Sequence, residues 1–118
     1  MTQAGGDEYR LVLVTCPHDR ADDLANILVG ESLCACVNIL ANIRSVYRWQ
    51  GEVTSDEESL LVMKTIDKMY DRLEARIKEI HPYEVPEIIC LKIDRGSQSY
   101  LDWLSGSIAG STNDSSAG

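Results

Sequence analysis

The stretch from Cys36 to Thr65 constrains the fold of this chain more than any other feature. In its first half, apolar residues recur at every second position, which is the period of a β-strand with one buried face. The members of this series are Val37, Ile39, Ala41 and Ile43. Strand-favouring β-branched and aromatic residues continue to Trp49, and Gly51 supplies the permissive backbone of a tight reversal. The pattern predicts one long β-hairpin that turns near residues 49–51.

This predicted hairpin is long for a chain of 118 residues. An arm from Val37 to Trp49 would reach about 40 Å at roughly 3.4 Å per residue, whereas strands are commonly about five or six residues long. Its exposed edges would be free to pair with other strands. We therefore expect a partner chain to cover the hairpin. The alternatives are a bulge or bend that folds the ribbon over its own domain, or a break into two shorter strands.

Shorter elements surround the hairpin. The patterns predict a strand at 9–15, a helix at 19–31, a second helix from Asp67 to the residues before Pro82, a strand at 87–94 and a short helix at 100–104. Asp19 and Asp67 are the expected N-caps of the two longer helices. We predict a flexible N-terminus at 1–7, one domain at 8–104 and a disordered, low-complexity tail at 105–118.

The resulting order is β-α-β-β-α-β plus a terminal helix, which is the ferredoxin-like arrangement of α+β proteins. It predicts an antiparallel sheet with two helices on one face. The other face is expected to be apolar or half-apolar, which is a second reason to expect a partner surface.

Composition and charge exclude several classes of protein. Hydrophobic residues make up 44% and charged residues 25% of the chain, as in soluble globular proteins. No apolar run approaches the roughly 20 residues of a membrane span, and the first ten residues lack the pattern of a signal peptide. We therefore expect a cytoplasmic protein without a membrane partner. The net charge of −8 argues against nucleic-acid binding and favours cations.

The chain carries no strong catalytic pattern. It has no Gly-rich phosphate loop, no dinucleotide fingerprint and no complete metal shell of the CxxC or HExxH kind. Cys16 and His18 could form a nucleophile and base, but a loop histidine is the simpler interpretation. Arg20 is the one candidate for an acylphosphatase-like anion site, and it has no placed partner. We therefore predict that the protein is not an enzyme.

His81 is the strongest candidate for a metal ligand. It lies at a predicted helix end, with Glu84 and Glu87 shortly after it, and imidazole with carboxylates suits Cu²⁺ and other divalent ions. The alternative is a histidine that complements the helix dipole. Cys34 and Cys36, two of the four cysteines, could form a soft-metal pair, but core packing of reduced thiols is the simpler interpretation. No cofactor is predicted to be required for folding.

The aromatic residues from Tyr47 onward could line a cleft, an interface or the core. The candidates for a cleft or interface are Tyr47, Trp49, Tyr83 and Trp103, together with Lys64. Lys64 is the one charge near the buried end of the returning strand. It requires a carboxylate or an anionic ligand as its partner, or it extends its amine to solvent.

Five motifs in order give the chain a recognisable pattern. They are residues 34–39 (CACVNI), 45–52 (SVYRWQGE), 61–65 (LVMKT), 81–87 (HPYEVPE) and 100–104 (YLDWL). From about Tyr9 to Leu104 the chain resembles the CutA divalent-cation tolerance family. The resemblance implies a ferredoxin-like protomer in a tight homotrimer whose shape is similar to that of PII signalling proteins. It also implies tolerance to copper and other divalent metals, with no established catalytic activity.

The resemblance transfers only part of a copper site. Bacterial relatives are proposed to use a cysteine at the end of the first strand and two adjacent histidines before Pro-Tyr. The corresponding positions here are Val14, Ile80 and His81, so only His81 is retained. Cys16, two residues after Val14, is the expected substitute.

Two hypotheses for function follow. The first is a homotrimer that binds a divalent metal, copper above all, through His81, Cys16, Glu84 and Glu87. The second is a PII-like signalling or scaffold protein that binds a small ligand or a protein partner in a cleft between subunits.

Overall fold

The computed structural model describes residues 8–108 and shows an α+β fold. Its strands are β1 (Tyr9–Cys16), β2 (Cys36–Trp49), β3 (Glu52–Ile66) and β4 (Ile88–Lys92). Its helices are α1 (Ala21–Gly30), α2 (Tyr70–Ile80) and α3 (Gln98–Gly106). The order of these elements is β-α-β-β-α-β followed by a helix, as predicted.

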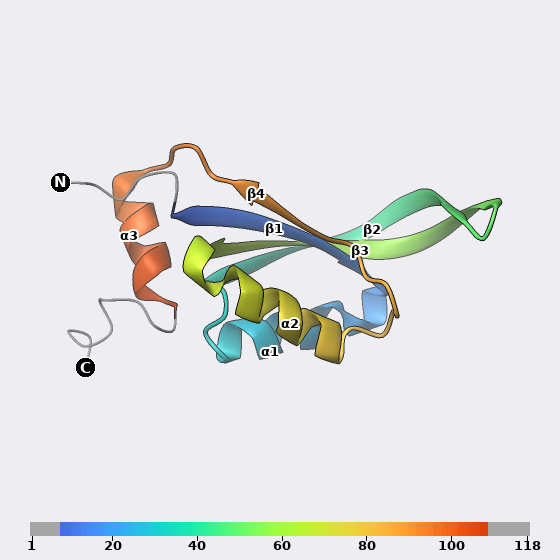
Figure 1. Ribbon diagram of the computed structural model, residues 1–118, viewed down its shortest axis with the longest axis horizontal. Helices are drawn as coiled ribbons and strands as arrows, with labels where there is room; N and C mark the ends of the chain where they lie inside the picture. The colour runs from blue at the N-terminus through green and yellow to red at the C-terminus, as the bar shows by residue number, and fades with distance from the viewer. Residues whose placement is uncertain (1–7, 109–118) are drawn as a thin grey trace.

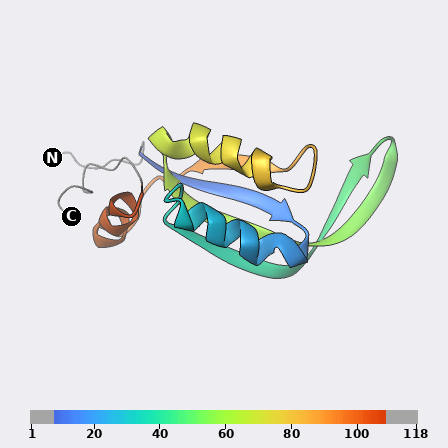
Figure 2. The ribbon, with the colours of Figure 1, turned by 90° about the horizontal axis from the view of Figure 1, so that it is seen from below.

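The four strands form one sheet in the order β2-β3-β1-β4, and every neighbouring pair is antiparallel. Helices α1 and α2 lie together on one face of this sheet, and α3 lies at the end away from the hairpin tip (Figures 1 and 2). The core lies between the sheet and the first two helices. Its fully buried side chains include Val12, Val14, Leu61 and Met63 from the sheet and Leu24, Leu28, Leu73 and Ile77 from the helices.

The predicted long hairpin is confirmed. Strands β2 and β3 pair as far as Trp49 and Glu52, so the connecting loop consists of two residues. Gln50 and Gly51 in that loop have φ angles of 51° and 82°. A two-residue loop with two positive φ angles matches the right-handed twist of the strands, and glycine adopts such a backbone without a Cβ clash.

A β-bulge interrupts strand β2. Leu40 pairs with Leu60 but Ile43 pairs with Glu58, so β2 has one extra residue, and Asn42 there has a φ of 62°. Ile39 pairs with Leu61, on the opposite face of β3 from Glu58. The predicted single buried face through Ile43 is therefore wrong, because the bulge moves Ile43 to the other face. Beyond this region the hairpin curves toward the side of the body on which α2 lies (Figure 2).

The sheet narrows where β1 ends. Strand β1 pairs with β3 from Tyr9 opposite Ile66 to Cys16 opposite Ser59, and Pro17 follows. Residues 52–58 of β3 therefore pair with β2 alone. The outer half of the hairpin is a two-stranded ribbon that projects past the body (Figure 1).

The helix starts differ from the prediction. Asp19 and Asp67 lie inside one-turn 3-10 segments (His18–Arg20 and Asp67–Met69), and neither α1 nor α2 has a side-chain N-cap. Each helix therefore follows directly from a 3-10 turn, which is wound more tightly than the α-helix itself. Helix α3 does have a cap, because the side chain of Ser97 accepts a hydrogen bond from the backbone N–H of Tyr100.

The ordered domain also extends past its predicted end at Leu104. Helix α3 continues to Gly106, and Ile108 is buried in the core. The predictions of a flexible segment at 1–7 and of disorder at 109–118 lie outside the described residues. Within residues 8–108, no helix combines the length and the apolar character that crossing a membrane requires.

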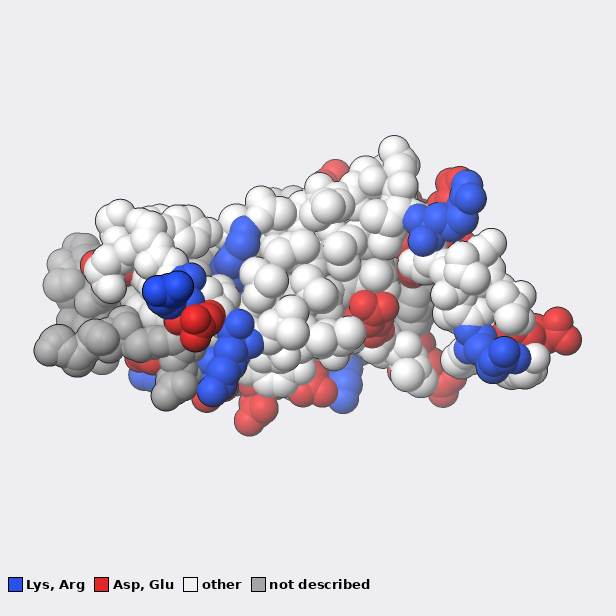
Figure 3. All heavy atoms as spheres, turned by 90° about the horizontal axis from the view of Figure 1, so that it is seen from above, with Lys and Arg blue, Asp and Glu red and all other residues white. Residues whose placement is uncertain are grey.

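The face of the sheet opposite α1 and α2 is rich in exposed apolar side chains. Leu40, Ile89 and Leu91 are each close to half exposed, at 46%, 45% and 46%. The register places Leu11 and Leu13 on the same face, opposite Leu91 and Ile89. Figure 3 looks down on this helix-free face, and few Lys, Arg, Asp or Glu side chains interrupt its middle. A patch of this kind is typical of a surface that another chain covers.

Candidate functional site

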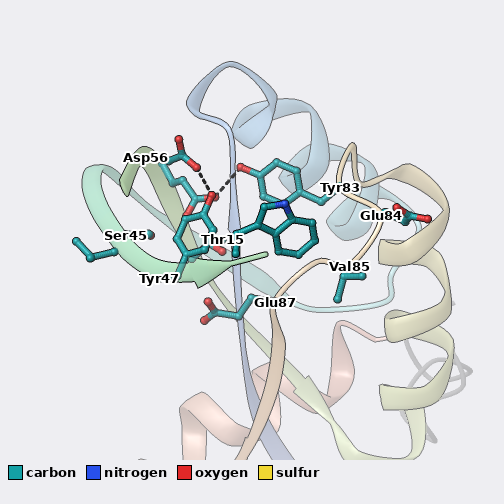
Figure 4. A pocket seen from close by; sticks show the side chains of 11 residues that line it. Thr15, Ser45, Tyr47, Asp56, Tyr83, Glu84, Val85 and Glu87 are labelled. Atoms are coloured by element: carbon teal, nitrogen blue, oxygen red, sulfur yellow. Dashed lines mark hydrogen bonds between the residues drawn. The ribbon is translucent and has the colours of Figure 1, made fainter. Parts of the chain in front are cut away.

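A cavity of about 610 Å³ lies where the hairpin leaves the body; we call it the hairpin cavity. Its walls come from the end of β1, from the outer halves of β2 and β3, and from the connection between α2 and β4. The lining residues are Thr15, Ser45, Val46, Tyr47, Trp49, Asp56, Glu58, Tyr83, Glu84, Val85 and Glu87. Tyr47 and Asp56 lie on one side, and Tyr83, Glu84 and Val85 lie on the other (Figure 4).

Glu58 is the most deeply placed charge in the hairpin cavity. Its side chain belongs to a residue only 5% exposed, and the Tyr83 hydroxyl donates a 2.7 Å hydrogen bond to its Oε2. Within residues 8–108, Glu58 makes no ion pair and Oε1 has no hydrogen-bond partner. Every fully enclosed side-chain N or O atom of the described residues does have a partner. The unpartnered Oε1 therefore opens into the cavity that Glu58 lines.

Two tyrosines of the hairpin cavity are bonded to carboxylates. Burial, followed by the hydrogen bond to Glu58, raises the pKa of Tyr83 well above its ordinary value. The hydrogen bond from Tyr47 to Asp56, followed by burial, raises the pKa of Tyr47 as well. Both phenols are therefore neutral donors near pH 7, and both carboxylates are oriented by them.

His81 is held by hydrogen bonds on both ring nitrogens. The backbone N–H of Tyr83 donates to Nδ1 at 3.0 Å, so Nδ1 carries a lone pair and Nε2 carries the proton. Nε2 then donates to the Thr15 carbonyl oxygen at 2.8 Å. His81 is 7% exposed and joins the end of β1 to the connection that follows α2. Its ring thus fixes one wall of the hairpin cavity.

The other predicted metal ligands are spread around His81. Glu84 and Glu87 are exposed and line the hairpin cavity, whereas Cys16 is buried, and burial raises the pKa of its thiol to about 11. Within residues 8–108, no three His, Cys, Asp or Glu side chains are grouped to hold a metal ion. The copper site on these residues stays a prediction.

The predicted cleft residues fall at two ends of the molecule. Tyr47, Trp49 and Tyr83 line the hairpin cavity. Lys64 lies outside that lining and donates to Asn38 and to Cys36 Sγ, the latter at 3.9 Å, so its partner is an amide and not a carboxylate. Trp103 belongs to α3 and packs against Tyr100 with ring centroids 5.4 Å apart.

The remaining candidates have structural partners. His18 Nδ1 lies 2.9 Å from the Ser59 hydroxyl. Cys34 is buried and burial raises its pKa to about 12, which agrees with the core-packing interpretation. All four cysteines are free thiols.

Sequence reasoning missed Asp56, Glu58 and Thr15. The acidic run at 56–58 has the composition of an exposed strand, and nothing in it marks one residue as buried. The period of the strand did offer one sign that Glu58 differs from its acidic neighbours. Glu58 is an even number of residues from Leu60 and Val62, so it lies on the same face of the strand as these apolar side chains.

The family model described as CutA1 divalent ion tolerance protein matches residues 10–107. The chain is 50% identical to the divalent-cation tolerance protein CutA of Thermus thermophilus over 95 residues, which are 80% of this chain and 92% of that protein. It is 47% identical to the chloroplastic CutA protein of Arabidopsis thaliana over 82% of this chain, but that match spans 54% of the relative.

A similar solved structure is CutA1 from Oryza sativa, with a TM-score of 0.86 and 42% identity. The alignment covers 88% of this chain and 96% of that one. Since one relative is described as chloroplastic, the cytoplasmic location stays a prediction.

Tyr83→Phe is expected to lower the free energy of unfolding by about 1–2 kcal/mol, because it removes the one hydrogen bond that the buried Glu58 side chain accepts within residues 8–108. Tyr47→Phe makes the same chemical change beside an exposed carboxylate, that of Asp56, and is expected to lower the free energy of unfolding by less. Guanidinium titrations at one fixed protein concentration would compare the three proteins. An equal loss in both variants would contradict the special position of Glu58.

The same pair gives a pH test. The folded-state pKa of Tyr83 is raised, so its stabilisation is full below about pH 10, the ordinary tyrosine value, and is lost as the pH rises through the folded pKa. The wild type should therefore lose more stability than Tyr83→Phe above about pH 10.

Proposed function

Because the chain belongs to the CutA1 divalent ion tolerance family, we propose that it is a homotrimeric binding protein that takes a small ligand in the hairpin cavity. The observation that carries this proposal is Glu58, a carboxylate in a residue only 5% exposed whose Oε1 opens into the cavity without a partner. A buried charge without a counter-ion is costly, so an empty cavity is an incomplete site.

The geometry supports binding better than catalysis. A volume of about 610 Å³ lies within the usual range for small-ligand sites. The nearest thiol, Cys16, is buried with its pKa raised to about 11, so it is a poor nucleophile. His81, the nearest imidazole, has both ring nitrogens engaged with the backbone. These features support a receptor whose walls are held fixed.

The helix-free face supports the homotrimer. Strand order and the placement of α1 and α2 support a ferredoxin-like protomer, which leaves this face uncovered in a single chain. Leu40, Ile89 and Leu91 lie on it near the two edge strands, where apolar burial would stabilise contact with identical chains.

Leu91→Glu tests this assembly. The substitution places a charge within the proposed contact, on the edge strand β4, and is expected to convert the trimer to smaller species at micromolar concentration. Val29→Glu makes the same kind of change on the exposed side of α1 and is expected to leave the mass unchanged. Light scattering after gel filtration would measure both, and a wild type with the mass of one chain would contradict the trimer.

Filling the mouth of the hairpin cavity tests the binding proposal. Val85 lines the cavity and is 73% exposed, so Val85→Trp can be introduced without disturbing the core. In a thermal-shift screen of metals and small metabolites, ligands that stabilise the wild type are expected to lose their effect on this variant. Val53→Trp, at a 66% exposed hairpin position outside the lining, is the matched control. Ligands that stabilise all three proteins equally would place binding elsewhere.

A second candidate function is copper binding through His81, and the tautomer of this residue favours it. Metal-binding histidines commonly donate one ring N–H to a backbone carbonyl, which leaves the other nitrogen basic. Here Nε2 donates to Thr15 and Nδ1 carries the lone pair. A Cu²⁺ ion would replace the Tyr83 N–H at Nδ1, with Cys16, Glu84 and Glu87 as the proposed further ligands. Cys16 would have to lose a proton that burial favours, so the affinity is expected to be modest.

Calorimetric titration with Cu²⁺ separates this candidate from the first. His81→Ala is expected to weaken copper binding by at least about tenfold, and His18→Ala, which removes the only other histidine, is expected to leave it within about twofold. Equal affinities for the wild type and His81→Ala would remove His81 from the account.

A further inference from the structure

The charges around the hairpin cavity have one sign. Asp56, Glu58, Glu84 and Glu87 line it, and no Lys or Arg does. A concave surface with charges of one sign concentrates ions of the other sign. Glu58 adds a specific contact to this general attraction. Its Oε1 is a hydrogen-bond acceptor in the cavity with no partner among residues 8–108. The occupant that this wall favours is a cation that donates hydrogen bonds.

Aromatic rings form much of the remaining lining. Trp49 and Tyr47 come from the outer hairpin, and Tyr83 comes from the opposite wall. The face of an aromatic ring attracts a cation and also packs against CH₂ groups. Val46 and Val85 add apolar surface. This lining suits a ligand that carries an apolar body as well as a charge.

Two observations separate an organic cation from a metal ion. Four carboxylates line the hairpin cavity, yet no three acidic, His or Cys side chains within residues 8–108 are grouped closely enough to hold a metal. The volume of about 610 Å³ is also far larger than a single ion needs. Carboxylates that are spread apart suit a cation whose charges are spread apart.

We propose that the hairpin cavity binds a small linear amine with an ammonium group at each end. One ammonium donates to Glu58 Oε1, the methylene chain lies against the rings of Tyr47, Trp49 and Tyr83, and the second ammonium is attracted by Glu84 and Glu87. This inference rests on the proposed function, because it names the class of ligand for the same cavity.

Matched ligands test the charge requirement. Isothermal titration at about 0.15 M salt would use cadaverine, its neutral analogue pentanediol and its dianionic analogue glutarate, which share one chain of five carbons. The full chain is expected to bind cadaverine and neither analogue. The affinity for cadaverine is expected to fall less with added salt than the affinity of a cation for an exposed carboxylate. The reason is that the contact with Glu58 is buried and therefore less screened.

Matched variants test the location. Glu58→Gln keeps an acceptor for the Tyr83 hydroxyl and removes the charge, so it is expected to weaken cadaverine binding by at least about tenfold. Glu57→Gln makes the same change one residue away, on an exposed side chain outside the lining, and is expected to alter affinity by less than about twofold. Trp49→Ala, at the exposed hairpin tip, is expected to weaken binding by about threefold.

The outcomes distinguish the two proposals. Equal loss in Glu58→Gln and Glu57→Gln would show non-specific attraction to an acidic protein and would overturn the amine site. Binding of pentanediol or glutarate that Trp49→Ala weakens would overturn the amine as the ligand class and keep the hairpin cavity as a binding site. No binding of any of the three ligands would overturn the amine site as well, while Val85→Trp in the thermal-shift screen decides separately whether the cavity binds any ligand.

Discussion

The sheet narrows from four strands to two over a short distance, because β4 pairs with β1 no further than Val14 and β1 itself ends at Cys16. The rest of the molecule depends on where this narrowing occurs. Strand β1 stops at Cys16 opposite Ser59 because Pro17 cannot continue the ladder, while β2 and β3 run on together. A two-stranded ribbon twists more strongly than a sheet of four strands. Beyond Ser59 the ribbon curves toward the side of the body on which α2 lies, and the hairpin cavity lies between it and the connection from α2 to β4.

The bulge in β2 acts at the same level. It lies between Leu40 and Ile43, opposite residues 58–60 of β3, and it moves the later residues of β2 to the other face. Without the extra residue, Ser45 and Tyr47 would change faces and would leave the hairpin cavity. The end of β1, the bulge and the position of Glu58 are thus one structural feature, because all three fall where the four-stranded sheet becomes a ribbon.

Much of this fold could be predicted from the chain, and the failures have physical causes. The hairpin, both longer helices and the order of elements follow from periodicity. The period of 3.6 along Leu73 and Ile77 reflects their burial directly, whereas the period of 2 along Val37 and Ile39 marks the strand although Ile39 is 38% exposed in the single chain. The bulge leaves no such mark, because Ala41 and Asn42 fit an ordinary strand as well. The prediction that Asp19 and Asp67 are N-caps was wrong because the backbone enters both helices through a 3-10 turn.

The candidate site was predictable in its aromatic part and not in its acidic part. Tyr47, Trp49 and Tyr83 stand out by residue type, and the hairpin cavity contains all three. Glu58 does not stand out among four acidic residues at 52–58, because its hydrogen-bond partner Tyr83 is distant in sequence. His81 illustrates the reverse case: its residue type suggested a ligand, and in the described chain its two nitrogens bind the backbone.

The burial of Glu58 is not explained by the stability of the fold alone. Replacing a buried charged residue by an apolar one of similar size is often neutral or stabilising, so stability alone does not favour a carboxylate at this position. The Tyr83 hydroxyl satisfies one oxygen and leaves the other open to the cavity, which is the arrangement that costs most in an empty protein and least in an occupied one. A folded chain that tolerates this cost has a cavity already shaped for its ligand, because the same hydrogen bond that orients Glu58 also fixes the 81–87 connection. If the proposed amine binds here, the same few atoms set both the stability of the protein and its affinity for that cation.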